Sequence, residues 1–281
     1  MSFVSPTDIK RIAAKYDFRF KKGLGQNFLT SQEVLEDIAE AAEIDGGGVI
    51  EIGPGFGVLT NELAKRADKV VALEIDDRLM PVLADTLSEY DNVKIINRDV
   101  MKMDIAALIA EEFPGERISI AANLPYYITT PIITTIIEAR LNIKNLVVMV
   151  QKEVADRITA QPGTKDYGAL SVLCAYYTEA ETIRRVPAEL FVPPPKVDST
   201  VVRMRFREEK AVSVNDEKLF FKVVKAAFSQ RRKTLLNCLA SGFSTDKAET
   251  AKIMESVGID PMRRGETLSL SEFANLANAM Y

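Results

Sequence analysis

The sequence contains no histidine and only two cysteines, Cys174 and Cys238. Without an imidazole, neither a histidine base nor a histidine metal ligand is available, which excludes most hydrolases built on a catalytic triad. The two cysteines lie far apart and form no CxxC pair, so the sequence indicates neither a zinc site nor a disulfide framework. We expect both to be small buried apolar residues, and we expect no metal site.

Long apolar runs are also missing. No stretch approaches the length that a helix needs to cross a bilayer. Residues 1–22 are mixed polar and basic, without the apolar core of a secretory signal. We therefore expect a cytoplasmic, monomeric protein without membrane association. With 281 residues, 47 % of them hydrophobic and 27 % charged, the chain is long enough for one large domain and a smaller one.

The chain has no overall excess of positive charge, since its net charge is −4. Proteins that bind nucleic acids usually carry a positive excess, so any such contact must use local basic clusters. Two clusters are present. One is residues 10–22, which include Lys21 and Lys22; the other is Arg231, Arg232 and Lys233, at the start of an expected helix. The plainer interpretation of each cluster is a solvated surface, and the alternative is a phosphate contact.

Apolar runs alternate with helical patterns in the first part of the chain. The runs rich in Val, Ile and Ala are residues 48–52, 70–75, 93–97, 118–123 and 145–150. Such runs without polar alternation are typical of parallel strands buried on both faces. Their spacing predicts an α/β domain with a doubly wound sheet.

The later part of the chain is predicted to contain two more strands, then a linker, and then only helices. Residues 182–187 and 199–207 are expected to be further strands, and the charged stretch 207–217 a linker. Beyond it, residues 219–228 place their apolar side chains on one helical face. We predict an α/β domain over residues 1–207 and a small all-helical domain over residues 208–281.

The segment EIGPGFG, residues 51–57, stands where the first strand gives way to a helix. Glycines allow close backbone approach to a ligand, although a plain turn is the simpler interpretation. Glu74 ends the second strand, where a carboxylate can accept both hydroxyl protons of a ribose. These features fit a dinucleotide or a nucleoside-type methyl donor equally well. Asp99 and Asn123, after the third and fourth strands, favour S-adenosylmethionine, which would lie along the carboxyl edge of the sheet.

The segment Asn123-Leu124-Pro125-Tyr126 is the sharpest local motif. An adenine amino group is a poor nucleophile, because its lone pair is delocalised into the ring. The side-chain carbonyl of Asn123 and the backbone carbonyl of Leu124 could hold its two hydrogens, and Tyr126 offers a face for stacking. A simple Pro-Tyr turn after a strand is the alternative.

Six segments, in order, resemble the ribosomal small-subunit RNA adenine dimethyltransferases, the family of the bacterial kasugamycin-resistance methyltransferase. They are KKGLGQNFL (21–29), EIGPGFGVLT (51–60), NLPYYI (123–128), FVPPPKVDS (191–199), AFSQRRKTLLN (227–237) and GIDPMRRGETLSLSEF (258–273). The resemblance covers nearly the whole chain. It implies a Rossmann-like methyltransferase sheet that binds S-adenosylmethionine.

The resemblance also implies roles for single residues. The residues expected to line the cofactor pocket are Asn27, Leu29, Gly53, Glu74, Asp99 and Asn123. Phe191 is expected to close on the target base opposite Tyr126, although a core phenylalanine in a Pro-rich turn is the plainer interpretation. The implied substrate is a pair of adjacent adenosines near the 3′ end of small-subunit ribosomal RNA, in a precursor subunit whose assembly the protein would assist.

Three other functions stay open at this stage. The first is the related large-subunit RNA adenine methyltransferase of macrolide resistance, which shares the cofactor loop and an Asn-x-Pro-Tyr motif. The PPPKVDS and SQRRKT segments resemble the small-subunit family better. The second is a ribosome-assembly factor that acts mainly by binding. The third is a dinucleotide oxidoreductase, in which the NLPY motif would have no purpose.

Overall fold

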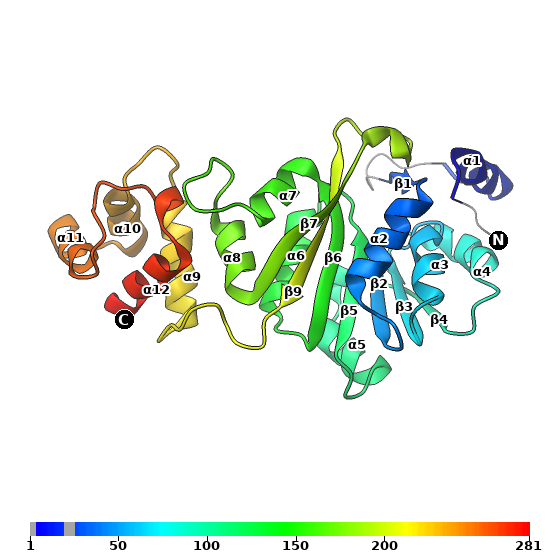
Figure 1. The fold of residues 1–281 in the computed structure, drawn as a ribbon, viewed down its shortest axis with the longest axis horizontal. Helices are drawn as coiled ribbons and strands as arrows, with labels where there is room; N and C mark the ends of the chain where they lie inside the picture. Colours follow the sequence, from blue (N-terminus) through cyan, green and yellow to red (C-terminus); the bar gives the residue numbers. More distant parts are fainter. Residues whose placement is uncertain (1–3, 20–25) are drawn as a thin grey trace. The chain divides into compact units, whose positions relative to one another are not determined.

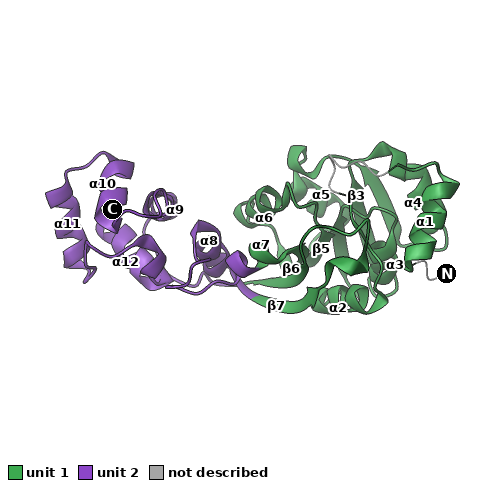
Figure 2. Cartoon of the chain, turned by 90° about the horizontal axis from the view of Figure 1, so that it is seen from above, with its two compact units in different colours: residues 1–155, 181–206 green, residues 156–180, 207–281 purple. Residues whose placement is uncertain are grey.

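A computed structural model describes residues 4–19 and 26–281. The chain divides into two compact units, coloured separately in Figure 2. Unit 1 comprises residues 1–155 and 181–206, and unit 2 comprises residues 156–180 and 207–281. The sequence placed one boundary near residue 207. In the structure, residues 156–180 group with the C-terminal helices, so the chain passes between the two units three times.

Unit 1 contains the sheet and the helices that cover it (Figure 1). Its strands are β1 (Phe28–Leu29), β2 (Gly48–Ile52), β3 (Lys69–Glu74), β4 (Val93–Asn97), β5 (Ile118–Asn123), β6 (Ile143–Gln151), β8 (Phe191–Val192) and β9 (Ser199–Phe206); β7 (Thr178–Val186) begins in unit 2. Its helices are α1 (Pro6–Lys15), α2 (Gln32–Ala42), α3 (Val58–Ala64), η2 (Asp77–Leu79), α4 (Met80–Thr86), η3 (Val100–Lys102), α5 (Ile105–Glu112), α6 (Thr129–Glu138) and η4 (Ala188–Leu190).

The main sheet has seven strands in the order β4-β3-β2-β5-β6-β9-β7. The pairs that join β4, β3, β2, β5 and β6 are parallel, whereas β9 pairs antiparallel with β6. Figures 1 and 2 show α2 and α3 on one face of the sheet, and α5 and α6 on the other. This arrangement buries both faces of the central strands, which explains their apolar composition. The predicted doubly wound α/β fold is therefore confirmed.

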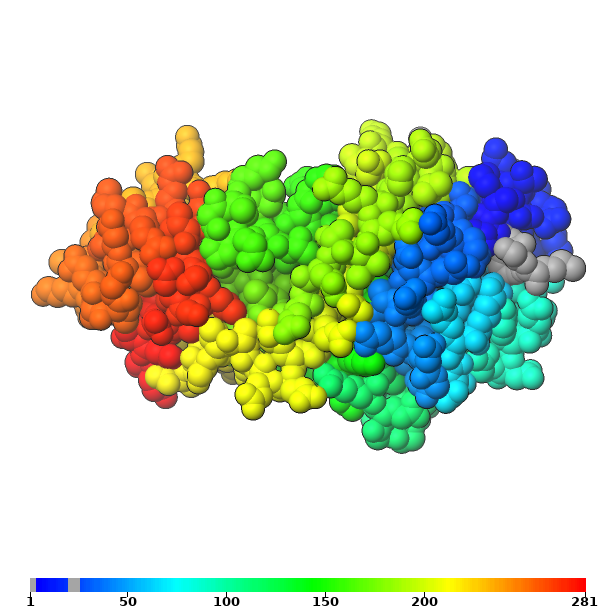
Figure 3. Space-filling model, viewed as in Figure 1, coloured from blue at the N-terminus to red at the C-terminus, as the bar shows by residue number. Residues whose placement is uncertain are grey.

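The N-terminal basic segment is partly helical. Ser5 and Asp8 form a capping box at the start of α1, whose apolar side chains Ile9 and Ile12 are buried. Of its cations, Arg11 pairs with Asp8 and Lys15 pairs with Asp85. Helix α1 is thus an amphipathic element of the fold, and the space-filling view shows this N-terminal segment, in dark blue, at the surface (Figure 3).

Unit 2 is built from helices. They are α8 (Ala169–Tyr177), α9 (Glu217–Ala227), α10 (Leu235–Phe243), α11 (Lys247–Ser256), η5 (Gly265–Thr267) and α12 (Leu270–Ala279), whereas α7 (Lys152–Ile158) crosses from unit 1. Its core contains Tyr176, Phe220, Leu239, Met254 and Phe273, each fully buried. The expected apolar face of residues 219–228 supplies Phe220, which stacks on Tyr176 with ring centroids 5.0 Å apart. The C-terminal helices that the sequence predicted are therefore present.

The start of β2 leaves no room for a side chain at Gly48. A Cβ there would lie 2.3 and 2.4 Å from two ring atoms of Phe113, which is itself 1 % exposed. We expect Gly48→Ala to lower the free energy of unfolding by about 1–3 kcal/mol, because the packed ring cannot yield freely. Urea unfolding would measure the change. Gly47→Ala is the matched control, since a Cβ at Gly47 meets nothing closer than 3.8 Å. Equal effects of the two substitutions would contradict this packing argument.

Candidate functional site

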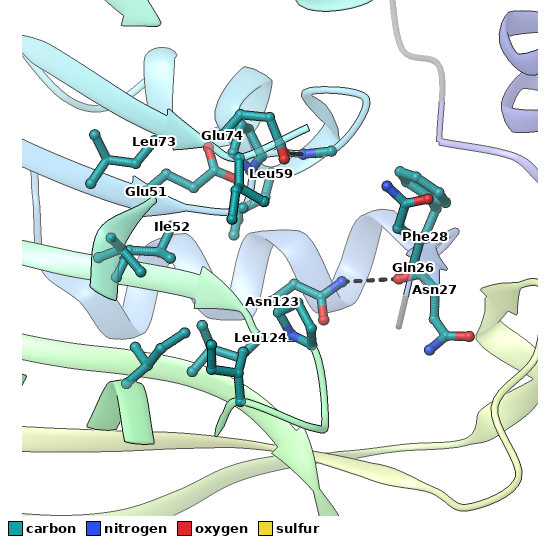
Figure 4. A pocket seen from close by; sticks show the side chains of 18 of the residues that line it. Gln26, Asn27, Phe28, Glu51, Ile52, Leu59, Leu73, Glu74, Asn123 and Leu124 are labelled. Atoms are coloured by element: carbon teal, nitrogen blue, oxygen red, sulfur yellow. Dashed lines mark hydrogen bonds between the residues drawn. The ribbon is translucent and has the colours of Figure 1, made fainter. Parts of the chain in front are cut away.

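A pocket lies in unit 1 at the carboxyl ends of four neighbouring parallel strands. Gly53 follows β2, Glu74 ends β3, Asp99 follows β4 and Asn123 ends β5, and all four line the pocket. Figure 4 shows Glu74 and Asn123 on its walls. The carboxyl ends of parallel strands meet at one sheet edge, which is where open α/β sheets bind ligands. The structure thus brings the predicted strand-end residues together.

The glycine loop has a backbone conformation that requires glycine. Gly53 and Gly55 have φ angles of 74° and 61°, in the left-handed region that side chains disfavour. The amide of Gly53 donates a hydrogen bond to the carbonyl of Leu73 at 2.9 Å, which fixes the loop to the end of β3. A Cβ at Gly55 would also lie 2.8 Å from the ring of Phe28. The loop therefore lies close against the pocket with no room for larger residues.

Glu74 is a buried carboxylate held by backbone amides. The Gly55 amide donates to Oε2 at 3.2 Å, and the Asp76 amide donates to Oε1 at 2.8 Å. Burial raises the pKa of the Glu74 carboxyl, and the amides of Asp76 and Gly55 oppose this shift. Each carboxylate oxygen can accept more than one hydrogen bond, so Glu74 can still accept hydrogens from a ligand.

Glu51 is a second carboxyl group in the pocket wall, within β2. It is 1 % exposed, and its Oε2 atom has no hydrogen-bond partner among residues 4–19 and 26–281. Burial raises the pKa of this carboxyl to about 8, and the nearby charge of Glu74 adds to the shift. Buried polar atoms are normally satisfied, so an unpaired one in a pocket wall is a place for a ligand donor.

Asn123 presents its side-chain oxygen to the pocket. Its amide nitrogen donates to the backbone carbonyl of Asn27 at 3.3 Å, the dashed contact in Figure 4. Neither Oδ1 of Asn123 nor the backbone carbonyl of Leu124 accepts a hydrogen bond from the described residues. Because the amide orientation is fixed by Asn27, two free acceptors stand next to each other in the wall of the pocket.

Tyr126 is anchored at its hydroxyl. That group lies 2.8 Å from the Ser199 hydroxyl at the start of β9, and burial raises the pKa of the phenol. The turn that carries it is closed at Pro125, whose carbonyl accepts from the amide of Ile128 at 3.2 Å and from the hydroxyl of Thr129 at 3.0 Å. The ring therefore has a fixed position among the pocket-lining residues.

The other expected pocket residues fall into two groups. Asn27 and Leu29 line the pocket. Phe191 pairs with Leu29 between β1 and β8, is 2 % exposed and is not among the lining residues. The plainer interpretation of Phe191, a core phenylalanine, describes its position in this structure, and the stacking role stays a prediction.

Asp99 lines the pocket and also caps a helix. Its Oδ1 accepts from the amide of Met101 at 3.0 Å, at the start of η3, and Lys102 lies 3.7 Å from its other oxygen. Both interpretations of this carboxylate, a cap and a pocket group, therefore apply together.

The structure describes the second of the two expected basic clusters in full, but the first only in part. Lys21 and Lys22 lie outside the described residues. The expectation that Arg231, Arg232 and Lys233 begin a helix is wrong, because α10 starts at Leu235 with Thr234 as its cap. The side chain of Thr234 accepts from the amide of Asn237, which fixes the start of α10 and leaves the three cations in the preceding turn. There, all three are exposed, and the guanidinium of Arg231 donates to the carbonyl of Lys165 at 2.5 Å.

Most of the other lining residues are apolar, but four polar ones were not predicted: Gln26, Glu51, Arg98 and Tyr127. Glu51 had a signal in the sequence, since it is the one charged residue in the apolar run 48–52. The Nε2 of Gln26 donates to Asp76 at 3.0 Å, which holds the segment before β1 against the end of β3. Tyr127 and Arg98 are exposed, a property that the sequence does not reveal.

In residues 4–19 and 26–281, no three His, Cys, Asp or Glu side chains come together as a metal site. None of the helices described there has the length and apolar composition that crossing a membrane requires.

Comparison with known proteins identifies the family of the chain. Residues 17–276 match the family described as ribosomal RNA adenine dimethylase. The ribosomal RNA small subunit methyltransferase A of Geobacillus thermodenitrificans is 55 % identical over 98 % of this chain and 96 % of its own length. The protein of the same name from Bacillus mycoides is 53 % identical over the same shares.

Two solved structures with similar folds are also adenosine or ribosomal RNA methyltransferases by name. A dimethyladenosine transferase from Plasmodium falciparum has a TM-score of 0.75 and 26 % identity, covering 88 % of this chain and 95 % of its own. The 23S rRNA methyltransferase ErmE has a TM-score of 0.70 and 28 % identity, covering 90 % of this chain and 99 % of its own. The sheet is therefore a Rossmann-like methyltransferase sheet, and the chain belongs to the ribosomal RNA adenine dimethylase family.

Proposed function

We propose that this enzyme uses S-adenosylmethionine to dimethylate the exocyclic amino groups of two adjacent adenosines near the 3′ end of small-subunit ribosomal RNA. The observation that carries the proposal is the pair of free acceptors at Asn123 and Leu124, oriented by the bond from Asn123 to Asn27. An amino group with two hydrogens needs two such acceptors. The curated relatives at 53–55 % identity bear the small-subunit name, whereas the 23S enzyme is 28 % identical.

The pocket residues fit the proposed cofactor. S-adenosylmethionine offers hydrogen-bond donors on its ribose, adenine and ammonium groups. The pocket offers the carboxylates of Glu74 and Asp99 and the unpaired Oε2 of Glu51, beside apolar side chains such as Leu73. Glu74 would accept from the ribose hydroxyls and Asp99 from the adenine amino group. When bound, the cofactor supplies the methyl group.

The residues of the chain then position the substrate. In the first transfer, Asn123 and Leu124 hold the two amino hydrogens, which aims the nitrogen and its lone pair into the pocket. In the second transfer a single hydrogen remains, and one of these two acceptors holds it. Tyr126 supports the adenine ring, with its hydroxyl anchored on Ser199. The target adenosine must leave its stack to reach them. Positioning of this kind provides most of the expected rate, and the proton leaves to solvent.

Unit 2 is proposed to contribute RNA contacts. Arg232 and Lys233 are exposed and form no ion pair with other described residues, so they are free to meet phosphates. Arg231 is already bonded to the carbonyl of Lys165. The partner would be a precursor small subunit in the cytoplasm, bound by a monomer that also assists assembly.

The assignment of Glu74 can be tested by cofactor binding. We expect Glu74→Ala to weaken the affinity for S-adenosylmethionine roughly 10- to 150-fold, because a hydrogen bond to a charged group contributes ~1.5–3 kcal/mol. Calorimetric titration gives the dissociation constant. Glu112→Gln is the control, since Glu112 is a similarly buried carboxylate that does not line the pocket. An unchanged dissociation constant for the Glu74 variant would remove this residue from the cofactor site.

The role of Asn123 can be separated from binding. With saturating cofactor, we expect Asn123→Ala to reduce methyl transfer to precursor small subunits at least 100-fold, the order of rate that precise positioning supplies. RNA affinity should stay nearly intact. Asn97→Ala is the matched control, because Asn97 also ends a strand of this sheet and also donates to a backbone carbonyl, that of Glu74, but does not line the pocket. Activity of the Asn123 variant within a few-fold of wild type would refute the proposed mechanism.

The RNA contact of unit 2 can be tested through salt. Each phosphate contact on single strands adds ~0.7 to the slope of log affinity against log salt, so replacing Arg232 and Lys233 with Ala should flatten it by about 1.4. Lys218→Ala with Lys252→Ala removes the same charge from exposed positions on α9 and α11 and serves as the control. Parallel lines for wild type and the Arg232/Lys233 variant would identify the cluster as a solvated surface.

A further inference from the structure

An exposed aromatic ring stands at the rim of the pocket. Tyr127 is 59 % exposed and lines the pocket, and its hydroxyl has no hydrogen-bond partner among the described residues. Its neighbour Tyr126 is half-buried and tied to Ser199. The two adjacent rings therefore occupy different environments, one within the pocket wall and one open to solvent. An exposed aromatic ring beside a binding pocket offers a face on which a nucleic-acid base can stack.

A cation stands at the same rim. The Arg98 side chain is exposed and lines the pocket, and it forms no ion pair with the described residues. The next carboxylate, Asp99, is already bonded to the amide of Met101 and lies near Lys102. The guanidinium of Arg98 is thus available to an external anion.

The segments that carry these two residues pack together. Helix α6 begins two residues after Tyr127, and η3 begins two residues after Arg98; these elements contact each other. The backbone amide of Arg98 donates to the carbonyl of Glu74 at 3.0 Å, and the turn of Tyr127 is closed at Pro125. Both residues are therefore held on fixed backbone, one with a ring face and the other with a positive charge.

We propose that Tyr127 and Arg98 form an outer subsite for the nucleotide next to the target adenosine. The base of this nucleotide stacks on the Tyr127 ring, and a backbone phosphate meets the Arg98 guanidinium. The inference rests on the proposed function, because it needs a substrate with an unpaired neighbouring base. Extrusion of the target removes a stacking partner from its neighbour, and an aromatic ring at the rim replaces that partner. With two adjacent adenosines, the subsite would hold the second one while the first is in the pocket.

The test uses the 281-residue protein and four variants. Tyr127→Ala removes the ring, Tyr127→Phe keeps its face, and Arg98→Gln removes the charge. Tyr281→Ala is the matched control, since Tyr281 is 77 % exposed and lies outside the pocket. Methyl transfer to precursor small subunits gives kcat and KM, and calorimetry gives the dissociation constant of S-adenosylmethionine. A short RNA with 2-aminopurine beside an unpaired adenosine reports stacking through its fluorescence.

We expect Tyr127→Ala to lower kcat/KM for the subunit roughly 5- to 150-fold, mainly through KM, with cofactor affinity unchanged. Tyr127→Phe and Tyr281→Ala should remain within about twofold of wild type. Quenching of 2-aminopurine should be lost with Tyr127→Ala alone. Arg98→Gln should flatten the salt slope of RNA affinity by about 0.7.

Other results would overturn the subsite. Unchanged kcat/KM and quenching in Tyr127→Ala would show that no base stacks there. A loss in Tyr127→Phe as large as in Tyr127→Ala would assign the effect to the hydroxyl. Weaker cofactor binding in either the Tyr127→Ala or the Arg98→Gln variant would place that residue in the cofactor site. If the wild type quenches through Tyr127 but transfers no methyl group, the subsite stands and the proposed function fails.

Discussion

Two backbone amides converge on the carboxylate of Glu74, and the arrangement of the pocket depends on them. One belongs to Gly55 in the glycine loop and the other to Asp76 beyond β3. A carboxylate as buried as this one is costly unless donors compensate it. The same bonds set the distance between the loop and the neighbouring strand. The cofactor side of the pocket is therefore shaped by the group that is proposed to hold the cofactor.

Further hydrogen bonds connect Asp76 to the part of the pocket that contains Asn123, where the substrate is proposed to bind. Asp76 accepts from Gln26 at 3.0 Å and from Nε of Arg78 at 2.8 Å, and the Arg78 guanidinium lies over the ring of Phe18 at 4.7 Å. The segment after Gln26 then supplies the Asn27 carbonyl that orients Asn123. A continuous set of contacts thus joins the proposed ribose acceptor to the proposed amino-group acceptor. A substitution at Glu74 is therefore expected to alter the position of Asn123 as well.

Much of unit 1 could be predicted from sequence because its signals are local. The apolar runs correspond to β2 to β6. Strands β2, β3, β5 and β6 are largely buried and tolerate few polar residues, whereas β4 lies at the sheet edge with Lys94 and Asn97 exposed. Polar groups such as Glu74 and Asn123 stand where those strands end, which predicted their meeting at one edge. The grouping of residues 156–180 with the C-terminal helices depends on contacts distant in sequence, and so the pattern placed a single boundary. The turn at Arg231 was missed because continuous helical periodicity obscured the cap at Thr234.

The roles of pocket residues were harder to predict where they depend on how exposed the side chain is. Tyr127 stands beside a motif residue of the same type, and only its exposure separates the two. Phe191 shows the opposite case, since a residue expected at the pocket is packed in the core. Periodicity and motif spacing describe which residues are near a strand end, whereas the direction of each side chain follows from the turn that carries it.

The three crossings of the chain between the units have a consequence for any attempt to separate the units by truncation. No single cut separates the two units, because β9 and most of β7 belong to unit 1 but follow α8, which belongs to unit 2. A chain that ends after β9 would keep α8 while losing α9 and α12, against which it packs within its unit. Val172 and Tyr176, now fully buried, would then lie uncovered and favour aggregation. In the sequence, unit 2 is thus interleaved with unit 1, and the chain does not consist of two domains joined end to end.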